Sequence, residues 1–112
     1  MPLERRRFLR TTLLRPVPCH VRFQSTLQGN PRESSVAALE VSRGGLRLAV
    51  PGKLPPGAVF QVWLTPPGHA RDYHLAGIVR WCRERQVNSE IGVQLTHAPK
   101  TDYDAWQRLC FV

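Results

Sequence analysis

Three arginines near the start of the chain have the side chains best suited to binding an anionic ligand. Arg5, Arg6 and Arg10 form an R-R-x-x-x-R segment just ahead of the first predicted strand. A guanidinium group donates a fork of hydrogen bonds to a phosphate or to the O6 and N7 atoms of guanine, and it also stacks on a base. The segment therefore predicts contacts with phosphate and guanine groups, and the alternative is a solvated basic tail.

A short turn between two predicted strands offers a second set of binding groups. It begins at Glu40 and has the sequence E-V-S-R-G-G. The Ser42 hydroxyl supplies a neutral hydrogen-bond donor, and Gly45 permits close approach of the backbone or a positive φ. The alternatives are a turn without a ligand and, for Glu40, a solvated carboxylate paired with Arg43 or Arg47.

Apolar residues alternate with polar ones in six short segments, which indicates strands with one buried face. These segments are 19–23, 36–41, 46–50, 60–64, 74–83 and 91–95. Proline and glycine between them, as in Pro51-Gly52, indicate turns. Six short strands at regular spacing predict an all-β domain, either an antiparallel barrel or a sandwich.

The end of the chain has a pattern typical of a helix over residues 101–111. Thr101 is the expected N-cap, and Asp102 and Asp104 lie in the first turn, where the helix dipole favours carboxylates. The apolar stripe of this helix consists of Tyr103, Trp106, Leu109 and Cys110. We expect that stripe to pack against the strands.

Length and composition indicate one small soluble module. A chain of 112 residues has room for a single core, and its 42% hydrophobic content is enough to form one. We divide it into a flexible basic arm over residues 1–15, a strand region over 16–98 and the helix over 101–111. No stretch approaches the roughly 18 apolar residues that a membrane-spanning helix needs.

The net charge and the spacing of the cysteines limit the classes of ligand that this chain is expected to bind. Lys plus Arg is 16 against 8 Asp plus Glu, and the net charge of +8 attracts nucleotides, nucleic acids or anionic lipids. Cys19, Cys82 and Cys110 are odd in number and far apart, so we expect reduced thiols in the cytosol rather than a disulfide framework or a zinc site. The histidines have no ligand spacing either, and we expect no metal and no cofactor.

Neither export nor catalysis is expected. Residues 5–10 are similar to a twin-arginine export motif, but residues 11–16 are charged and broken by Pro16 where export needs about 7 to 15 apolar residues. The carboxylates are few and scattered, and the sequence has neither a G-x-S-x-G motif nor a phosphate-binding glycine loop. These features favour a binding protein over an enzyme.

The arginine segment and the serine-glycine turn together resemble the signature of the PilZ domain, the bacterial receptor module for cyclic di-GMP. That family pairs R-x-x-x-R with a D/N-x-S-x-x-G turn in the same order and with a similar separation. The strands around residues 46–48, 78–81 and 91–93 and the closing helix are also similar, so the resemblance spans nearly the whole chain. It implies a small antiparallel six-stranded β-barrel of the split or Greek-key type, with a flexible basic N-terminal arm and one C-terminal α-helix.

The resemblance also implies a function and a set of site residues. The function is that of a cytoplasmic receptor that senses cyclic di-GMP, a second messenger, and signals to a partner protein. The implied ligand-binding residues are Arg5, Arg6, Arg10, Glu40, Ser42 and Gly45. A flexible arm loses entropy when it becomes ordered over the ligand, and such a change between two states is suited to a switch. We expect residues 1 to about 12 to be mobile until the ligand binds.

Glu40 departs from the family pattern, which has Asp or Asn at this position. The extra methylene displaces the carboxylate oxygens by more than about an ångström, far enough to lose a hydrogen bond unless the longer side chain bends back. One alternative is therefore a PilZ-like protein-interaction module that does not bind the nucleotide. Another is a small basic barrel that binds single-stranded nucleic acid, with Trp63 and Trp81 as the stacking residues.

Overall fold

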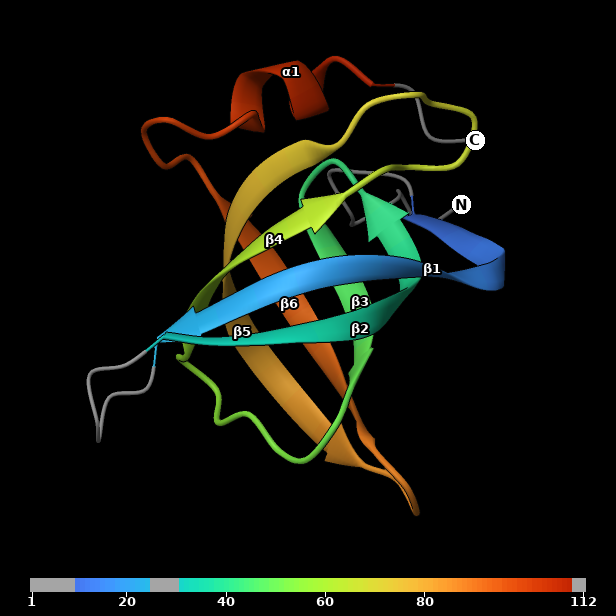
Figure 1. Cartoon of the computed structure of the whole chain (residues 1–112), viewed down its shortest axis with the longest axis vertical. Coiled ribbons are helices and arrows are strands. Elements are labelled where there is room, and N and C mark those ends of the chain that lie inside the picture. The colour runs from blue at the N-terminus through green and yellow to red at the C-terminus, as the bar shows by residue number, and fades with distance from the viewer. Residues whose placement is uncertain (1–9, 25–30, 110–112) are drawn as a thin grey trace, which may run out of the picture.

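Six strands and one short helix follow one another along the chain (Figure 1). The computed structural model describes residues 10–24 and 31–109. The strands are β1 (Arg10–Gln24), β2 (Pro31–Ser42), β3 (Gly45–Val50), β4 (Val59–Leu64), β5 (Tyr73–Glu84) and β6 (Ser89–Thr96), and the helix is α1 (Tyr103–Gln107).

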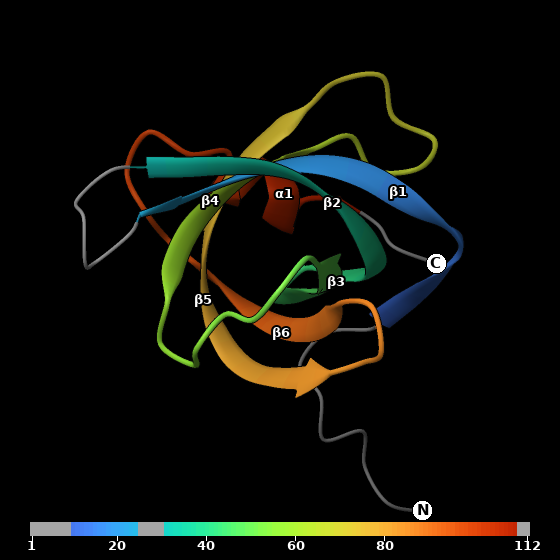
Figure 2. The same ribbon diagram turned by 60° about the horizontal axis from the view of Figure 1, so that its bottom comes forward.

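The sheet closes on itself. Its strands pair in the order β1-β2-β3-β6-β5-β4, and β4 pairs with β1. All six pairings are antiparallel, which confirms the predicted antiparallel barrel and rules out the sandwich. Figure 2 shows the strands around their common interior. Closure gives each strand two partners, so the barrel has no long unpaired edge.

The core of the barrel follows from the period-two patterns. In β3 and β4, every second residue is buried, as the alternation predicts. The largest side chains that are almost fully buried include Trp106, Phe60, Leu48, Leu64, Leu75 and Ile91. A core with large residues from β3, β4, β5, β6 and α1 fixes the position of each strand relative to the others.

The first strand begins earlier than the sequence analysis predicts. The proposed arm covered residues 1–15, but β1 starts at Arg10, so residues 10–15 belong to a strand. Residues 10–12 pair with the end of β2 before the register breaks between Thr12 and Val17. This irregular stretch contains Pro16 and interrupts the alternation, which is why the pattern of apolar residues did not extend to it. Residues 1–9, where the rest of the arm was placed, lie outside the described residues.

The alternation in β5 also breaks. The sequence pattern put Trp81 on the same face as Leu75 and Val79, but the register shifts between Val79 and Trp81. Trp81 is therefore 39% exposed, and its indole lies over Gly92 of β6, where a Cβ atom would be 2.0 Å from Nε1. Gly92 is thus required to seat this ring.

The closing helix is shorter than the predicted range of 101–111. Backbone amides of Arg108 and Leu109 donate to carbonyls three residues back, which tightens and ends the last turn. Thr101 was the expected cap, but its hydroxyl donates to the Ala98 carbonyl at 2.7 Å instead. Asp102 occupies the N-cap position without a side-chain capping bond.

Asp102 and Trp106 hold α1 against one end of the barrel (Figure 1). The Asp102 carboxylate accepts a hydrogen bond from the His74 amide at 2.8 Å, and the Asp102 amide donates to the His74 carbonyl at 2.7 Å. Trp106 is completely buried and meets the Tyr73 ring edge to face, with 5.6 Å between the centroids. The helix therefore closes this end of the core, as its apolar stripe predicts.

Candidate functional site

The candidate site is built around the turn between β2 and β3. The Ser42 hydroxyl accepts a hydrogen bond from the Gly45 amide at 3.0 Å and donates to the Gly45 carbonyl at 3.2 Å. A hydroxyl has a single hydrogen to donate, and here it is used inside the turn. Ser42 therefore fixes the shape of the turn, and a direct contact between its hydroxyl and a ligand stays a prediction.

Gly45 is needed for close approach and not for an unusual backbone conformation. A Cβ atom on Gly45 would lie 2.4 Å from the Val93 carbonyl oxygen of β6. The described glycines with positive φ are Gly52, Gly57 and Gly68, so a positive φ does not explain Gly45. Only a residue without a side chain lets β3 pair with β6 immediately after the turn.

The helix α1 also holds this turn, through one buried and one exposed hydrogen bond. The Trp106 indole Nε1 donates to the Ser42 carbonyl at 2.9 Å, and the Gln107 side-chain amide donates to the Arg43 carbonyl at 2.7 Å. Two consecutive carbonyls of the turn are thus fixed by two consecutive residues of the helix. The sequence pattern identifies Trp106 only as a core residue and does not single out Gln107, because nothing in it links a helix to a turn more than 60 positions earlier.

The strand register brings part of the arginine segment to this turn. Arg10 is the first residue of β1 and lies opposite Ser42 of β2 in the antiparallel ladder. The two halves of the expected site, R-x-x-x-R and S-x-x-G, therefore meet along the backbone. Arg5 and Arg6 lie outside the described residues.

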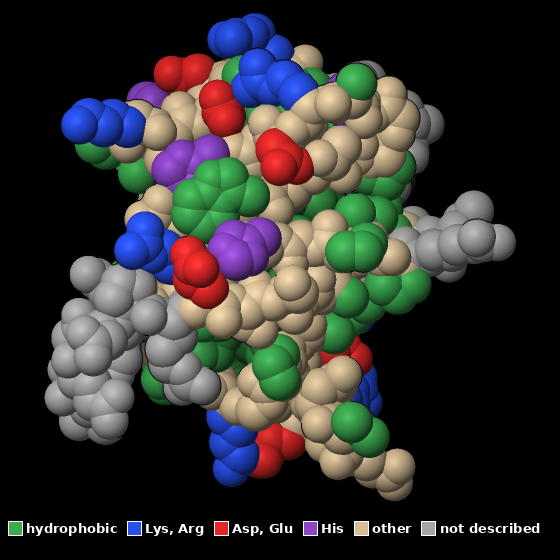
Figure 3. All heavy atoms as spheres, in the orientation of Figure 1, with side chains coloured by type: hydrophobic (Ala, Val, Ile, Leu, Met, Phe, Trp, Pro, Cys, Tyr) green, Lys and Arg blue, Asp and Glu red, His purple; other side chains and the backbone are tan. Residues whose placement is uncertain are grey.

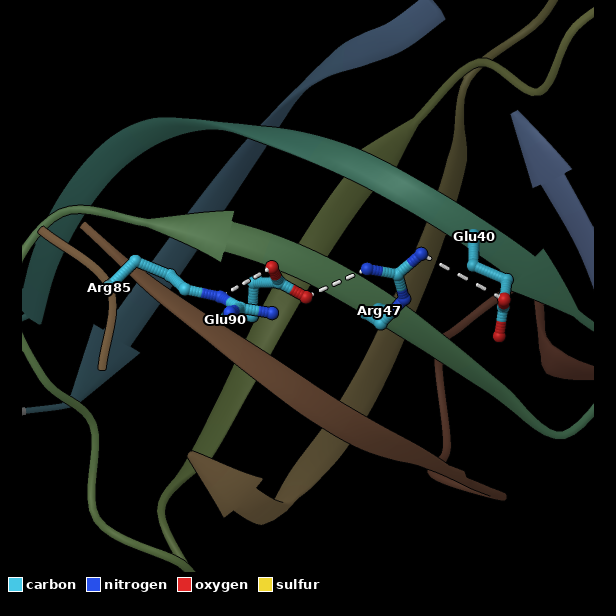
Figure 4. A network of polar contacts seen from close by, with 4 residues as sticks. All are labelled: Glu40, Arg47, Arg85 and Glu90. Carbon is cyan, nitrogen blue, oxygen red and sulfur yellow. Dashed lines mark hydrogen bonds and ion pairs between the residues drawn. The ribbon is translucent and has the colours of Figure 1, made fainter. Parts of the chain in front are cut away.

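Glu40 is part of a chain of ion pairs on the outer face of β2, β3 and β6 (Figure 4). Its carboxylate is 4.0 Å from Arg47 Nη2, and Arg47 Nη1 donates to Glu90 Oε1 at 2.7 Å. The other Glu90 oxygen accepts a hydrogen bond from Arg85 Nε at 2.9 Å. Arg47 is therefore the nearby cation that the sequence analysis offered as one of two partners for Glu40. Glu90 and Arg85 were not anticipated, because only the β3–β6 pairing brings them together with Arg47.

Glu90 makes a testable contribution to stability. The hydrogen bond from Arg47, aided by Arg85, lowers the pKa of the Glu90 carboxyl below its usual value, although desolvation opposes the shift. A carboxyl with a lowered pKa stabilises the folded state above its unfolded pKa of about 4.3, and this stabilisation disappears as the pH falls through the folded pKa.

We therefore expect Glu90→Gln to lower the free energy of unfolding by about 1 kcal/mol or less at pH 7, since the pair is partly exposed. The difference from the native chain should shrink below pH 4 and vanish in stronger acid. Urea unfolding at several pH values measures it. The control is Glu84→Gln, which removes an ion pair with Lys53 whose side chains are 64% and 70% exposed and should change stability very little. A pH-independent difference for Glu90→Gln would contradict the assignment.

Other chemistry-bearing residues form no second centre in the part of the chain that the structure describes. No three His, Cys, Asp or Glu side chains there lie close enough together to hold a metal ion. Burial raises the pKa of the Cys19 thiol to about 12, so this cysteine is unreactive in the core. Among the same residues, no helix is long and apolar enough to cross a membrane.

The start of β1, at Arg10, lies beside the serine-glycine turn on a closed six-stranded barrel. A comparison with sequence models of protein families identifies the family that has this combination. The model of the PilZ domain matches residues 4–112. The chain belongs to the PilZ domain family. The match includes both PilZ motifs and α1, and it confirms the resemblance inferred from the sequence. A comparison with curated protein sequences gave no match.

Solved structures with the same fold include two PilZ-containing structures of Escherichia coli YcgR. The PilZ domain of YcgR with c-di-GMP has a TM-score of 0.66 at 19% identity, and the alignment covers 94% of this chain and 88% of that one. The complex of YcgR with c-di-GMP has a TM-score of 0.67 at 18% identity, over 95% and 44% of the two chains. The Bacillus subtilis inhibitor of motility, MotI/DgrA, has a TM-score of 0.72 at 14% identity, over 95% and 49%. This PilZ chain thus spans about half the length of MotI and of the longer YcgR chain.

Proposed function

We propose that this chain is a receptor for cyclic di-GMP and that the ligand binds over the β2–β3 turn, beside the start of β1. The observation that carries the proposal is the β1–β2 register, which places Arg10 opposite Ser42. One residue of each PilZ motif therefore lies next to the other. The family assignment supports the same function, as do the two YcgR structures with c-di-GMP. The protein acts as a binding domain in the cytoplasm and not as an enzyme.

Each proposed site residue has a physical role. Cyclic di-GMP carries two phosphates and two guanines, so Arg6 and Arg10 donate to these groups and Arg5 supports them. Ser42 and Gly45 hold the turn in a shape that lets its backbone lie against the ligand. Arg10 lies just before the register shift in β1 between Thr12 and Val17, where it is paired with β2. We expect the residues that precede Arg10 to close over the ligand from this fixed point.

The signal passes to a partner protein through this closure. A chain segment that becomes ordered on binding changes the surface that the receptor presents, and the ligand shifts the equilibrium by its differential affinity for the two states. Residues 10–12, which the sequence predicts to be mobile, are already paired with β2. Amide hydrogen exchange of residues 1–9 with and without cyclic di-GMP therefore tests this step, and we expect increased protection in the bound form. High and equal protection in both forms would contradict it.

Calorimetric titration of the native chain is the decisive experiment. We expect heat of binding with cyclic di-GMP and none with GTP or a short single-stranded oligonucleotide at the same concentrations. Binding of the oligonucleotide alone would support a nucleic-acid-binding barrel. No binding of any of the three would favour the protein-interaction module, the alternative that Glu40 suggests.

Replacing Arg6 or Arg10 with Ala should weaken cyclic di-GMP binding by about 1.5 to 3 kcal/mol each, the usual contribution of a hydrogen bond to a charged group. The free energy of unfolding should hardly change, because motif residues outside the core contribute little to stability. Titration of the variants measures the effect. Arg83→Ala is the control, since Arg83 is exposed and lies toward the other end of the barrel, opposite Glu90 of β6. Unchanged affinity in both motif variants would rule out the assigned site.

Glu40 is tested by shortening and by removing its carboxylate. Glu40→Asp should keep or raise the affinity for cyclic di-GMP, because it restores the side chain that the family pattern carries, and Glu40→Ala should lower it. Stability should change by about 1 kcal/mol or less, since the pair with Arg47 is long at 4.0 Å. Isothermal titration of the three forms side by side separates the outcomes. Equal affinities would mean that Glu40 takes no part, and binding by the Asp form alone would mean that Glu40 blocks the site.

A further inference from the structure

A groove lies on the barrel away from the β2–β3 turn. It is formed by β1, β4, β5 and the connection that follows β6, and its volume is about 530 Å³. The lining residues that matter here are Arg22, Phe23, Val59, Phe60 and Lys100. Arg22 and Phe23 are near the end of β1, whereas Arg10 begins that strand, so the groove and the proposed ligand site are separate.

The charged residues at this groove have one sign. Arg22 and Lys100 line it, and none of the described lining residues is acidic. Both side chains lack an ion pair with any residue in 10–24 or 31–109. Glu33 lies opposite Arg22 in the ladder, but its carboxylate pairs with His20 at 3.7 Å. The groove therefore offers two cations to an anionic partner.

The same groove contains exposed apolar surface. Val59 is 59% exposed and Phe23 is half-buried, whereas the Phe60 ring, which packs against Phe23 with 5.4 Å between centroids, is buried in the core. An exposed branched aliphatic side chain in a groove is the kind of surface that an apolar side chain of a partner covers.

The backbone at the rim is strained. Lys100 has φ of 63° and is the one non-glycine residue with a positive φ in the described part of the chain. Lysine has no preference for this left-handed conformation, which glycine and asparagine adopt far more readily. Such strain persists only where the surrounding structure holds the backbone in place, and Lys100 is held in this conformation at the rim of the groove.

We propose that this groove binds a short acidic segment of a partner protein, with carboxylates on Arg22 and Lys100 and an apolar side chain against Val59. A volume of about 530 Å³ suits a few residues of peptide rather than a whole domain surface. This proposal rests on the receptor function proposed above and goes beyond nucleotide binding, because the groove would be the surface at which the receptor contacts its partner protein.

The neighbouring aromatic residues favour a peptide over a nucleic acid. Trp63 is stacked on His74 at 4.6 Å with an interplanar angle of 2°, and His20 packs against it at 5.6 Å. The space-filling view shows histidine side chains crowded around a hydrophobic one on this side of the molecule (Figure 3). One face of the Trp63 indole is therefore covered by His74 and is not open to bases, which single-strand binding requires.

Selection of random seven-residue peptides on the immobilised full chain, without cyclic di-GMP, tests the proposal independently of the nucleotide site. We expect the enriched peptides to carry acidic residues around an aromatic or aliphatic one. A synthetic copy of an enriched peptide should bind about tenfold more weakly to Arg22→Gln and to Lys100→Gly, and equally well to the control Lys53→Gln. Lys53 is 70% exposed and lies outside the groove.

Lys100→Gly separates binding from folding. Glycine tolerates the left-handed conformation, so this variant should be at least as resistant to heat as the native chain while it loses the peptide. No enrichment, enriched peptides without acidic residues, or equal binding by all variants would overturn the proposal. Displacement of the peptide by a short oligonucleotide would overturn it as well, in favour of a nucleic-acid surface. Since no nucleotide is present, failure here leaves the cyclic di-GMP titration as a separate question.

Discussion

Replacing Gly45 with Ala is expected to lower the free energy of unfolding by about 3 kcal/mol and to remove cyclic di-GMP binding. A Cβ atom at this position would lie 2.4 Å from the Val93 carbonyl oxygen, which is well inside van der Waals contact. The obstacle is backbone in the middle of β6, so β3 must move away as a unit. That movement breaks the two hydrogen bonds between Ser42 and Gly45 that set the shape of the turn.

Gly92→Ala is the matched control. The added methyl group would also clash, at 2.0 Å, but it meets the Trp81 side chain, which is 39% exposed and can rotate outward. We expect a smaller loss of about 1 kcal/mol and unchanged affinity for the nucleotide, because Gly92 is not part of the turn. Urea unfolding and isothermal titration of both variants measure the two effects. If Gly45→Ala binds cyclic di-GMP like the native chain, the turn is not the binding site.

The barrel could be predicted from the sequence because its strands each carry a local signal. In β3, for example, Leu46, Leu48 and Val50 alternate with half-buried residues, and the alternation alone identifies an inward face. The start of β1 had no such signal. Residues 10–12 join the strand because the end of β2 offers them a partner, and pairing with a distant strand overrides the local pattern.

The candidate site, like the fold, could be predicted from the sequence only in part. The residue types that bind phosphate and guanine were visible in the motifs, and so was the turn. The groups that hold the turn were not, since Trp106 and Gln107 reach it only through the closure of the barrel by α1. Likewise, the link from Arg47 to Glu90 depends on the pairing of β3 with β6, which a single sequence does not reveal.

The contact between α1 and the turn leads to the second large effect. Trp106 is completely buried, so Trp106→Ala removes a large core side chain and should cost about 3 to 5 kcal/mol of stability. That is a large share of the stability of a small domain, and the variant is expected to be partly unfolded at 25 °C. Chemical unfolding followed by circular dichroism measures this loss.

Trp106→Phe distinguishes the packing role from the hydrogen bond. Phenylalanine keeps an aromatic ring in the core next to Tyr73 but lacks the indole N–H that donates to the Ser42 carbonyl at 2.9 Å. The smaller ring and the lost hydrogen bond to the Ser42 carbonyl together should cost about 2 kcal/mol, and the turn should open more often. We therefore expect faster amide exchange at Gly45 and several-fold weaker binding of cyclic di-GMP. Trp63→Phe, on the outer face of β4, removes an equal volume and should change neither. Because its ring does not contact the turn, a similar loss of affinity in both variants would mean that α1 stabilises the barrel without positioning the site.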